Sequence, residues 1–134
     1  MSMQSSTRRS VGRVGISVLA MATLACSKGP RTGIIASSDL VSLVASVSGG
    51  KHTLRLDAAP GARINARLPP VLALRDSTRV TFASASLTSD SSYFIDSPTT
   101  SLNTVKATRG TLLASVCPAN LRVCLSVTLD VRLR

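Results

Sequence analysis

Two cysteines near the C-terminus, Cys117 and Cys124, are the residues of this 134-residue chain whose spacing most clearly permits chemistry. Pro118 opens the segment between them, and Asn120 is a residue that favours turns. On both sides of this segment apolar and polar residues alternate with a period of two, which is typical of half-buried strands. The pattern predicts an antiparallel hairpin in which the two cysteines lie directly opposite each other.

A single register satisfies both faces of this hairpin. With the cysteines opposed, apolar residues pair on the inner face, while the cysteines share the outer face with serine, threonine and aspartate. A slip of one residue would mix the two faces. The residues expected to face the core are Leu112, Ala114, Val116, Leu125, Val127 and Leu129.

Directly opposed cysteines are close enough for a disulfide, because the Cα atoms of such pairs lie about 4.5 to 5.5 Å apart. The loop is short, so the expected stabilisation is modest, roughly 2.5 kcal/mol. Two uses of the bond stay open at this point. It is either a structural link that pins the terminal hairpin of a small exported domain, or an exchangeable pair that another protein's thiol reaches on the outer face.

The first 25 residues resemble a bacterial export signal. Three arginines precede an apolar stretch, Val14 to Leu24, which is too short to span a bilayer as a helix. The stretch runs into Ala25-Cys26 and resembles a lipobox, in which the cysteine is lipidated and begins the mature protein. The alternative is an ordinary signal peptide followed by a chance cysteine. Lipidation of Cys26 would leave the other two cysteines to pair with each other, with no thiol left over.

These boundaries divide the chain into a signal peptide (1–25), a polar tether (26–33) and one domain (34–134). After residue 25 there are 13 basic residues against six aspartates, with no glutamate or tryptophan. The basic residues are scattered and few aromatics accompany them, so no nucleic-acid surface is expected. A solvated basic surface, attracted to anionic envelope lipids or polysaccharides, fits this distribution.

Short alternating segments separated by turn signals predict an all-β domain. Gly49-Gly50 marks a two-residue hairpin, and Pro69-Pro70 ends a strand. No helix is expected after Cys26. The expected strands, seven or eight in all, include residues 41–47, 51–58, 63–68, 71–75, 79–87, 102–108, 111–117 and 125–133. The predicted fold is an antiparallel β-sandwich.

Other chemistry finds little support in the sequence. His52 is the only histidine and has no carboxylate cluster nearby, so it is interpreted as an ordinary half-exposed residue, and neither a metal nor a cofactor is expected. Scattered aspartates without glutamate offer no acid–base pair or catalytic triad, which argues against a hydrolase. An apolar island, Tyr93-Phe94-Ile95, interrupts the polar segment from Thr88 to Ser101.

Several of these features together resemble an immunoglobulin-like family, the N-terminal periplasmic domain of the DsbD-type thiol:disulfide interchange proteins and its stand-alone relatives. The resemblance covers His52 to Arg134. It rests on Pro60-Gly61 followed by Ile64-Asn65, on Pro69-Pro70, on Gly110 and Leu112 leading to Val116-Cys117, and on Cys124 before a closing strand.

The resemblance implies that Cys117 and Cys124 alternate between dithiol and disulfide and exchange electrons with a periplasmic thioredoxin-like or other disulfide-exchange protein. It also implies a cap loop, carrying Tyr93 and Phe94, that shields the pair. The chain would then be a lipoprotein anchored in a bacterial membrane through lipid on Cys26, with its domain facing the periplasm. The alternative is a non-enzymatic envelope module with a purely structural disulfide.

The sequence departs from the family pattern at three places. Ala62-Arg63 stands where an aromatic residue and a histidine are usual, and the cysteines have six residues between them, one more than in the redox members. Leu125-Ser126 replaces a proline pair after the second cysteine. These departures bear on the activity more than on the fold.

Overall fold

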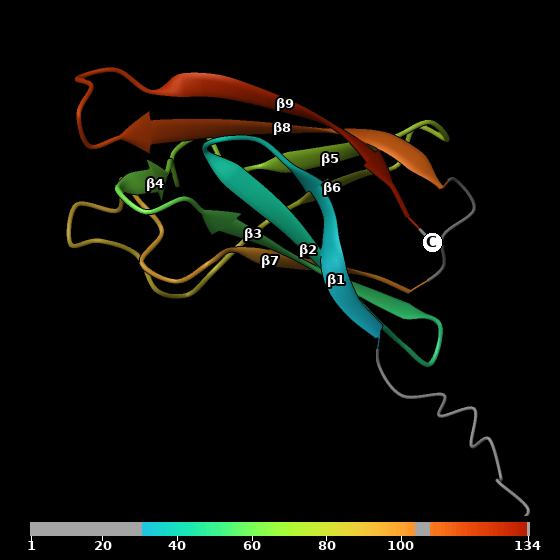
Figure 1. Cartoon of the computed structure of the whole chain (residues 1–134). Helices are drawn as coiled ribbons and strands as arrows, with labels where there is room; N and C mark the ends of the chain where they lie inside the picture. Colours follow the sequence, from blue (N-terminus) through green and yellow to red (C-terminus); the bar gives the residue numbers. More distant parts are fainter. Residues whose placement is uncertain (1–30, 104–107, 134) are drawn as a thin grey trace, which may run out of the picture.

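A computed structural model describes residues 31–103 and 108–133, and it contains two antiparallel β-sheets packed face to face (Figure 1). The predicted antiparallel β-sandwich is confirmed, with nine strands among the described residues rather than the expected seven or eight. The strands are β1 (Arg31–Ser37), β2 (Val41–Ser48), β3 (Lys51–Ala58), β4 (Ala62–Ile64), β5 (Val71–Leu74), β6 (Arg79–Thr81), β7 (Thr99–Leu102), β8 (Arg109–Pro118) and β9 (Leu125–Arg132). The predicted signal peptide, and Cys26 with it, lies outside the described residues.

The four-stranded sheet has the order β1-β2-β3-β7. Its central hairpin turns at Gly49 and Gly50, whose φ angles of 57° and 78° are those that a two-residue hairpin turn requires and that glycine adopts without strain. In the part of the chain that the structure covers, no helix is long and apolar enough to cross a membrane.

The five-stranded sheet is built around β8, its longest strand. The C-terminal end of β8 pairs with β4, and its N-terminal half pairs with β5, which in turn pairs with β6. The other edge of β8 is occupied along most of its length by β9. Strand β9 is therefore an edge strand, with no hydrogen-bonded partner beyond it among the described strands.

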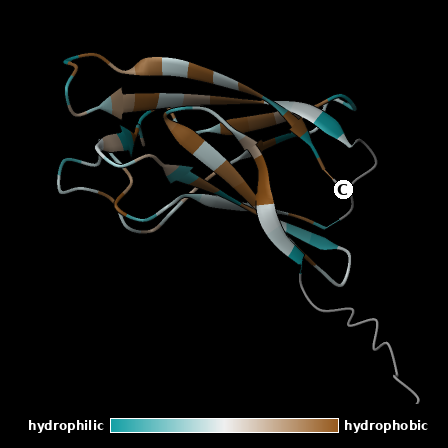
Figure 2. Cartoon of the chain, in the orientation of Figure 1, coloured by the Kyte–Doolittle hydropathy of each residue, from teal (hydrophilic) through white to brown (hydrophobic). Residues whose placement is uncertain are grey.

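The core lies between the two sheets and consists almost entirely of aliphatic side chains. Brown and pale bands alternate along β8, β9 and β2 in Figure 2, as the period of two requires. Phe82 is the one aromatic residue with no exposed surface among the described residues, and its main-chain N–H donates to the carbonyl oxygen of Pro70. Of the six hairpin residues predicted to face the core, all but Leu125 are buried.

Several details differ from the sequence-based prediction. Strand β1 begins at Arg31, inside the expected tether (26–33), and the strand expected over 79–87 ends at Thr81. The strand expected over 63–68 ends at Ile64, because the side-chain oxygen of Asn65 accepts hydrogen bonds from the main-chain N–H groups of Arg67 and Leu68 and turns the chain. The strand expected over 102–108 lies earlier, at β7, and residues 104–107 are outside the described part. Leu125 is 39% exposed, because the tip of the β8–β9 hairpin projects past the four-stranded sheet (Figure 1).

Candidate functional site

Cys117 and Cys124 form a disulfide at the tip of the β8–β9 hairpin, with their Cα atoms 4.0 Å apart. The ladder of the hairpin runs in an unbroken register to Val116 and Leu125, and the cysteines are the next pair. The predicted register is therefore confirmed throughout. The short Cα separation is that of a pair that exchanges no main-chain hydrogen bonds, in which side chains approach most closely.

The two cysteines differ in how much they are covered. Cys117 is only 7% exposed, whereas Cys124 is an exposed residue. The cause is their place in the sheet: Cys117 lies in an inner strand between β4 and β9, and Cys124 precedes the edge strand β9. The outer-face position that the sequence predicts for both cysteines thus leaves only one of them open to solvent.

Arg63 stands on the other side of Cys117 from the disulfide partner. It is directly opposite Cys117 in the β4–β8 ladder, so both side chains leave the same face of the sheet. The three residues form a row across the sheet in the order Arg63, Cys117, Cys124. The row therefore has a cationic residue on one side of Cys117 and the disulfide partner on the other.

Tyr93 holds this arginine in place. The guanidinium carbon of Arg63 lies 3.9 Å from the centre of the Tyr93 ring, a cation–π arrangement. The backbone of Tyr93 is bridged to Asn65, whose main-chain N–H and side-chain amide both donate to Ser115 on β8. These hydrogen bonds and the bridge to Asn65 place Tyr93 over the outer face of the five-stranded sheet.

Phe94, the other aromatic residue of the predicted cap loop, takes a different position. Its main-chain N–H donates to the carbonyl oxygen of Ile64, and its side chain packs against the core. Of the two aromatic residues, Tyr93 therefore contacts Arg63, which lies in the same row as the disulfide. Phe94 instead packs against the hydrophobic core.

The loop that carries Tyr93 is closed by Asp90. The carboxylate of Asp90 accepts hydrogen bonds from the Thr88 hydroxyl at 2.7 Å and from the main-chain N–H of Ser92 at 3.1 Å. The Thr88 hydroxyl oxygen in turn accepts from the N–H of Tyr93. These donors, led by the Thr88 hydroxyl, lower the pKa of Asp90 to about 2.

We expect this loop to open in acid. Because the folded pKa of Asp90 is below its usual value, the carboxylate stabilises the loop above about pH 4, and this contribution is lost as the pH falls toward 2. The amide signal of Ser92, followed by NMR, should therefore titrate with a midpoint near pH 2. In Asp90→Asn this titration should disappear, while Asp96→Asn serves as a matched control that retains it. A midpoint at the ordinary aspartate pKa would contradict the hydrogen-bonded arrangement.

Exposed apolar residues flank the exposed cysteine along the chain. Leu121 and Val123 in the hairpin loop are 46% and 62% exposed, and Leu125 follows Cys124 directly. We call these three residues the tip patch. An exposed apolar cluster of this kind marks a contact surface more often than scattered single residues do.

The remaining candidates contribute nothing to this site. His52 is half-buried in β3, paired with Val47 and Leu102 at the other end of the sandwich. Within residues 31–103 and 108–133, no group of three histidine, cysteine, aspartate or glutamate side chains is placed to hold a metal ion.

Sequence reasoning missed Arg63 and the tip patch. The pairing of Arg63 with Cys117 joins residues 54 positions apart, and nothing local in the sequence indicates it. The tip patch could have been predicted from the sequence, because Leu121 and Val123 are apolar residues within a loop that begins with a proline.

Comparison of the chain with protein-family models, with curated proteins and with solved structures found no match. The class of protein is therefore defined by the fold and the site themselves. It is a small antiparallel β-sandwich that carries a cross-strand disulfide at the tip of its terminal hairpin.

Proposed function

We propose that this protein is a lipid-anchored periplasmic domain that exchanges its Cys117–Cys124 disulfide with the dithiol of a thioredoxin-like partner. The observation that carries the proposal is the asymmetry of the pair. The exposed cysteine precedes an edge strand, and the covered cysteine has an arginine on its far side. The resemblance of the sequence to the DsbD-type N-terminal domains supports the same activity.

The geometry fits nucleophilic attack at one sulfur. A partner thiolate approaches the Cys124 sulfur from the open edge of the sheet and forms a new S–S bond with it. The Cys117–Cys124 bond breaks, and the Cys117 sulfur leaves as a thiolate, whose negative charge the cationic Arg63 in the neighbouring strand favours. The partner's second thiolate then attacks the mixed disulfide. This releases reduced Cys124, so two electrons have passed from the partner to this chain.

The tip patch gives the partner a surface to dock on. Its exposed apolar side chains belong to residues close to Cys124 in the chain, and their burial would favour the encounter complex by roughly 25 cal/mol for each Å² removed from water. Tyr93 stacks on Arg63, which lies on the other side of Cys117 from Cys124. The exposed Cys124 is therefore the sulfur that a partner reaches more easily.

Trapping of the mixed disulfide tests the direction of attack. In Cys117→Ser the exposed Cys124 keeps its thiol but has lost the residue that resolves a mixed disulfide, so incubation with oxidised glutathione should give a stable adduct. Cys124→Ser, which retains only the covered Cys117, is the matched control. It should form at least about tenfold less of the glutathione adduct. Both variants carry Cys26→Ala, and intact mass measures the adduct. Equal yields from the two variants would contradict attack at Cys124.

The anchor is tested separately. If Cys26 carries lipid, Cys26→Ala should move the protein from the membrane fraction to the soluble periplasmic fraction. The variant that lacks both Cys117 and Cys124 is the matched control, since it also loses cysteines but should stay with the membrane. Membrane association that survives Cys26→Ala would overturn the lipoprotein proposal.

The second candidate function is an envelope module whose disulfide is only structural. The observation that favours it is the burial of Cys117 together with the unbroken ladder up to the cysteines, as expected of a bond that pins a terminal hairpin. The two candidates differ in whether the disulfide of the folded protein can be reduced without unfolding.

A further inference from the structure

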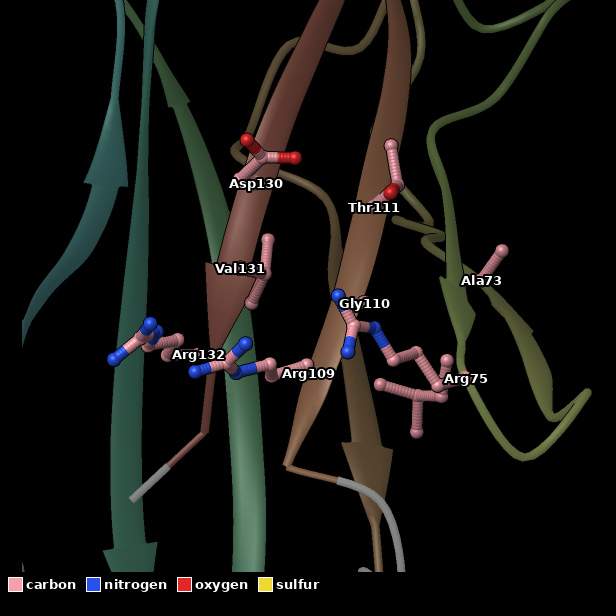
Figure 3. Close-up of a pocket in the computed structure, with 9 residues that line it drawn as sticks. Ala73, Arg75, Arg109, Gly110, Thr111, Asp130, Val131 and Arg132 are labelled. Carbon is pink, nitrogen blue, oxygen red and sulfur yellow. The ribbon is translucent and has the colours of Figure 1, made fainter.

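Three arginines line a groove at the end of the five-stranded sheet farthest from the disulfide. Arg109 on β8 is directly opposite Arg132 on β9, and the main-chain N–H of Arg75 donates to the carbonyl oxygen of Arg109 at 3.1 Å. Their side chains follow one another across the sheet in Figure 3, and the groove, of about 360 Å³, is lined by all three. We call these residues the arginine row.

A close approach of two strands builds this row. Gly110 follows Arg109, and a Cβ atom at its position would lie 2.7 Å from the carbonyl oxygen of Ala73 and 2.9 Å from the Leu74 side chain. Only glycine leaves room for β5 to come this near to β8. The approach brings Arg75, which directly follows β5, beside Arg109.

Two positive charges of the row, those of Arg109 and Arg132, start from positions directly opposite each other on neighbouring strands. Like charges directly opposite each other on neighbouring strands are destabilising. The ion pair between Arg55 and Asp57 lies elsewhere, on β3. Asp130 also lines the groove, but its carboxylate points away from the three guanidinium groups in Figure 3. An oxyanion bound between the arginines would remove their repulsion, and arginine matches phosphate oxygens in a bidentate manner.

A further basic residue lies at the same end of the five-stranded sheet. Arg79 begins β6 and is directly opposite Ala73, which lines the groove together with the arginine row.

An exposed apolar residue adjoins the row. Ile34 on β1 is 66% exposed, and it lines a second groove together with Arg132 and Asp130. A soluble phosphate would gain nothing from an isoleucine at this place. The boundary of a bilayer, where phosphate groups and acyl chains meet, offers partners to both kinds of side chain.

We propose that the arginine row binds phosphate oxyanions, and that these are the headgroups of an anionic bilayer on which this end of the sandwich rests. The described chain begins at the same end, at Arg31, and the apolar stretch Val14 to Leu24 precedes it in sequence. The choice of a bilayer over a free phosphate rests partly on the proposed anchor, whereas the oxyanion site does not. With this end on the membrane, the disulfide at the opposite end faces away from it.

The test uses the isotope-labelled full chain in bicelles, which accommodate its apolar N-terminal stretch in every sample. Replacing about a third of a neutral lipid by phosphatidylglycerol should shift the amide signals of Gly110 and Val131, and added salt should reverse the shift. Replacing Arg75, Arg109 and Arg132 by glutamine should weaken this response roughly 100-fold, since each basic residue at an anionic surface contributes about fivefold. The matched control replaces Arg55, Arg67 and Arg122, has the same net charge and should respond as the wild type does.

A parallel arm adds inorganic phosphate to neutral bicelles and distinguishes the two sources of the oxyanion. A response to phosphatidylglycerol that exceeds the response to millimolar phosphate supports membrane docking. A response to inorganic phosphate alone would overturn the bilayer as ligand, and no response in either arm would overturn the site. Equal losses in the two triple variants would show that net charge alone acts and would also overturn it. If the triple variant fails to fold, Arg109→Gln against Arg122→Gln gives the same comparison.

Discussion

Replacing Phe82 by alanine should lower the free energy of unfolding by about 3 to 5 kcal/mol, the largest effect of any single substitution in the described core. Phe82 has no exposed surface and is the largest side chain in an otherwise aliphatic core. Alanine would leave a cavity that neighbouring leucines and valines on two sheets cannot fill without moving whole strands. A domain of this size has about 5 to 15 kcal/mol of stability in all, so the variant would be close to unfolding at room temperature.

Equilibrium unfolding in urea measures the effect. The control is Leu68→Ala, which also removes a large apolar side chain but from a position that is 65% exposed, and it should change the midpoint little. The disulfide stays intact in both variants. A loss below about 1 kcal/mol in Phe82→Ala would mean that the ring is not enclosed by the two sheets as the structure has it.

The parts of the fold that could be read from the sequence are those determined by neighbours along the chain. The β8–β9 hairpin and the β2–β3 hairpin follow from a period of two on both sides of a turn. The end of β4 could not be read in this way, because the Asn65 side chain diverts the backbone in a segment that still alternates. Leu125 fits the inner-face pattern as well as Val127 does, and only the extent of the opposite sheet decides that it is exposed.

The same distinction applies to the candidate site. The sequence predicts the opposed cysteines, since a single local register contains both of them. The arginine behind Cys117, and the tyrosine that holds it, come from segments far away in the chain that meet only through long-range strand pairing. The asymmetry between the two sulfurs, on which the proposed chemistry depends, therefore becomes visible only in three dimensions.

Reduction of the disulfide by dithiothreitol should be fast in the folded protein. Because Cys124 is exposed at the edge of the sheet, we expect the rate without denaturant to lie within about tenfold of the rate in the unfolded chain, where both sulfurs are accessible. A structural disulfide that is reduced only after global unfolding would react slower by the equilibrium constant of unfolding, roughly 10³-fold or more. The two candidate functions are thus separated by about two orders of magnitude in one rate. The rate is followed by quenched mass spectrometry.

The dependence of this rate on urea, measured below the unfolding midpoint, distinguishes attack on the folded protein from reduction through global unfolding. Native-state attack predicts a rate that is nearly independent of urea, whereas a rate that rises in proportion to the unfolded fraction would rule out the exchange function.

Arg63→Gln should slow native reduction about threefold, because the departing Cys117 thiolate loses its cationic neighbour. Arg67→Gln is the matched control and should leave the rate of reduction unchanged. Tyr93→Ala should speed native reduction if the ring shields the pair, without shifting the urea midpoint. Phe94→Ala, which removes a side chain packed on the core, should lower that midpoint instead.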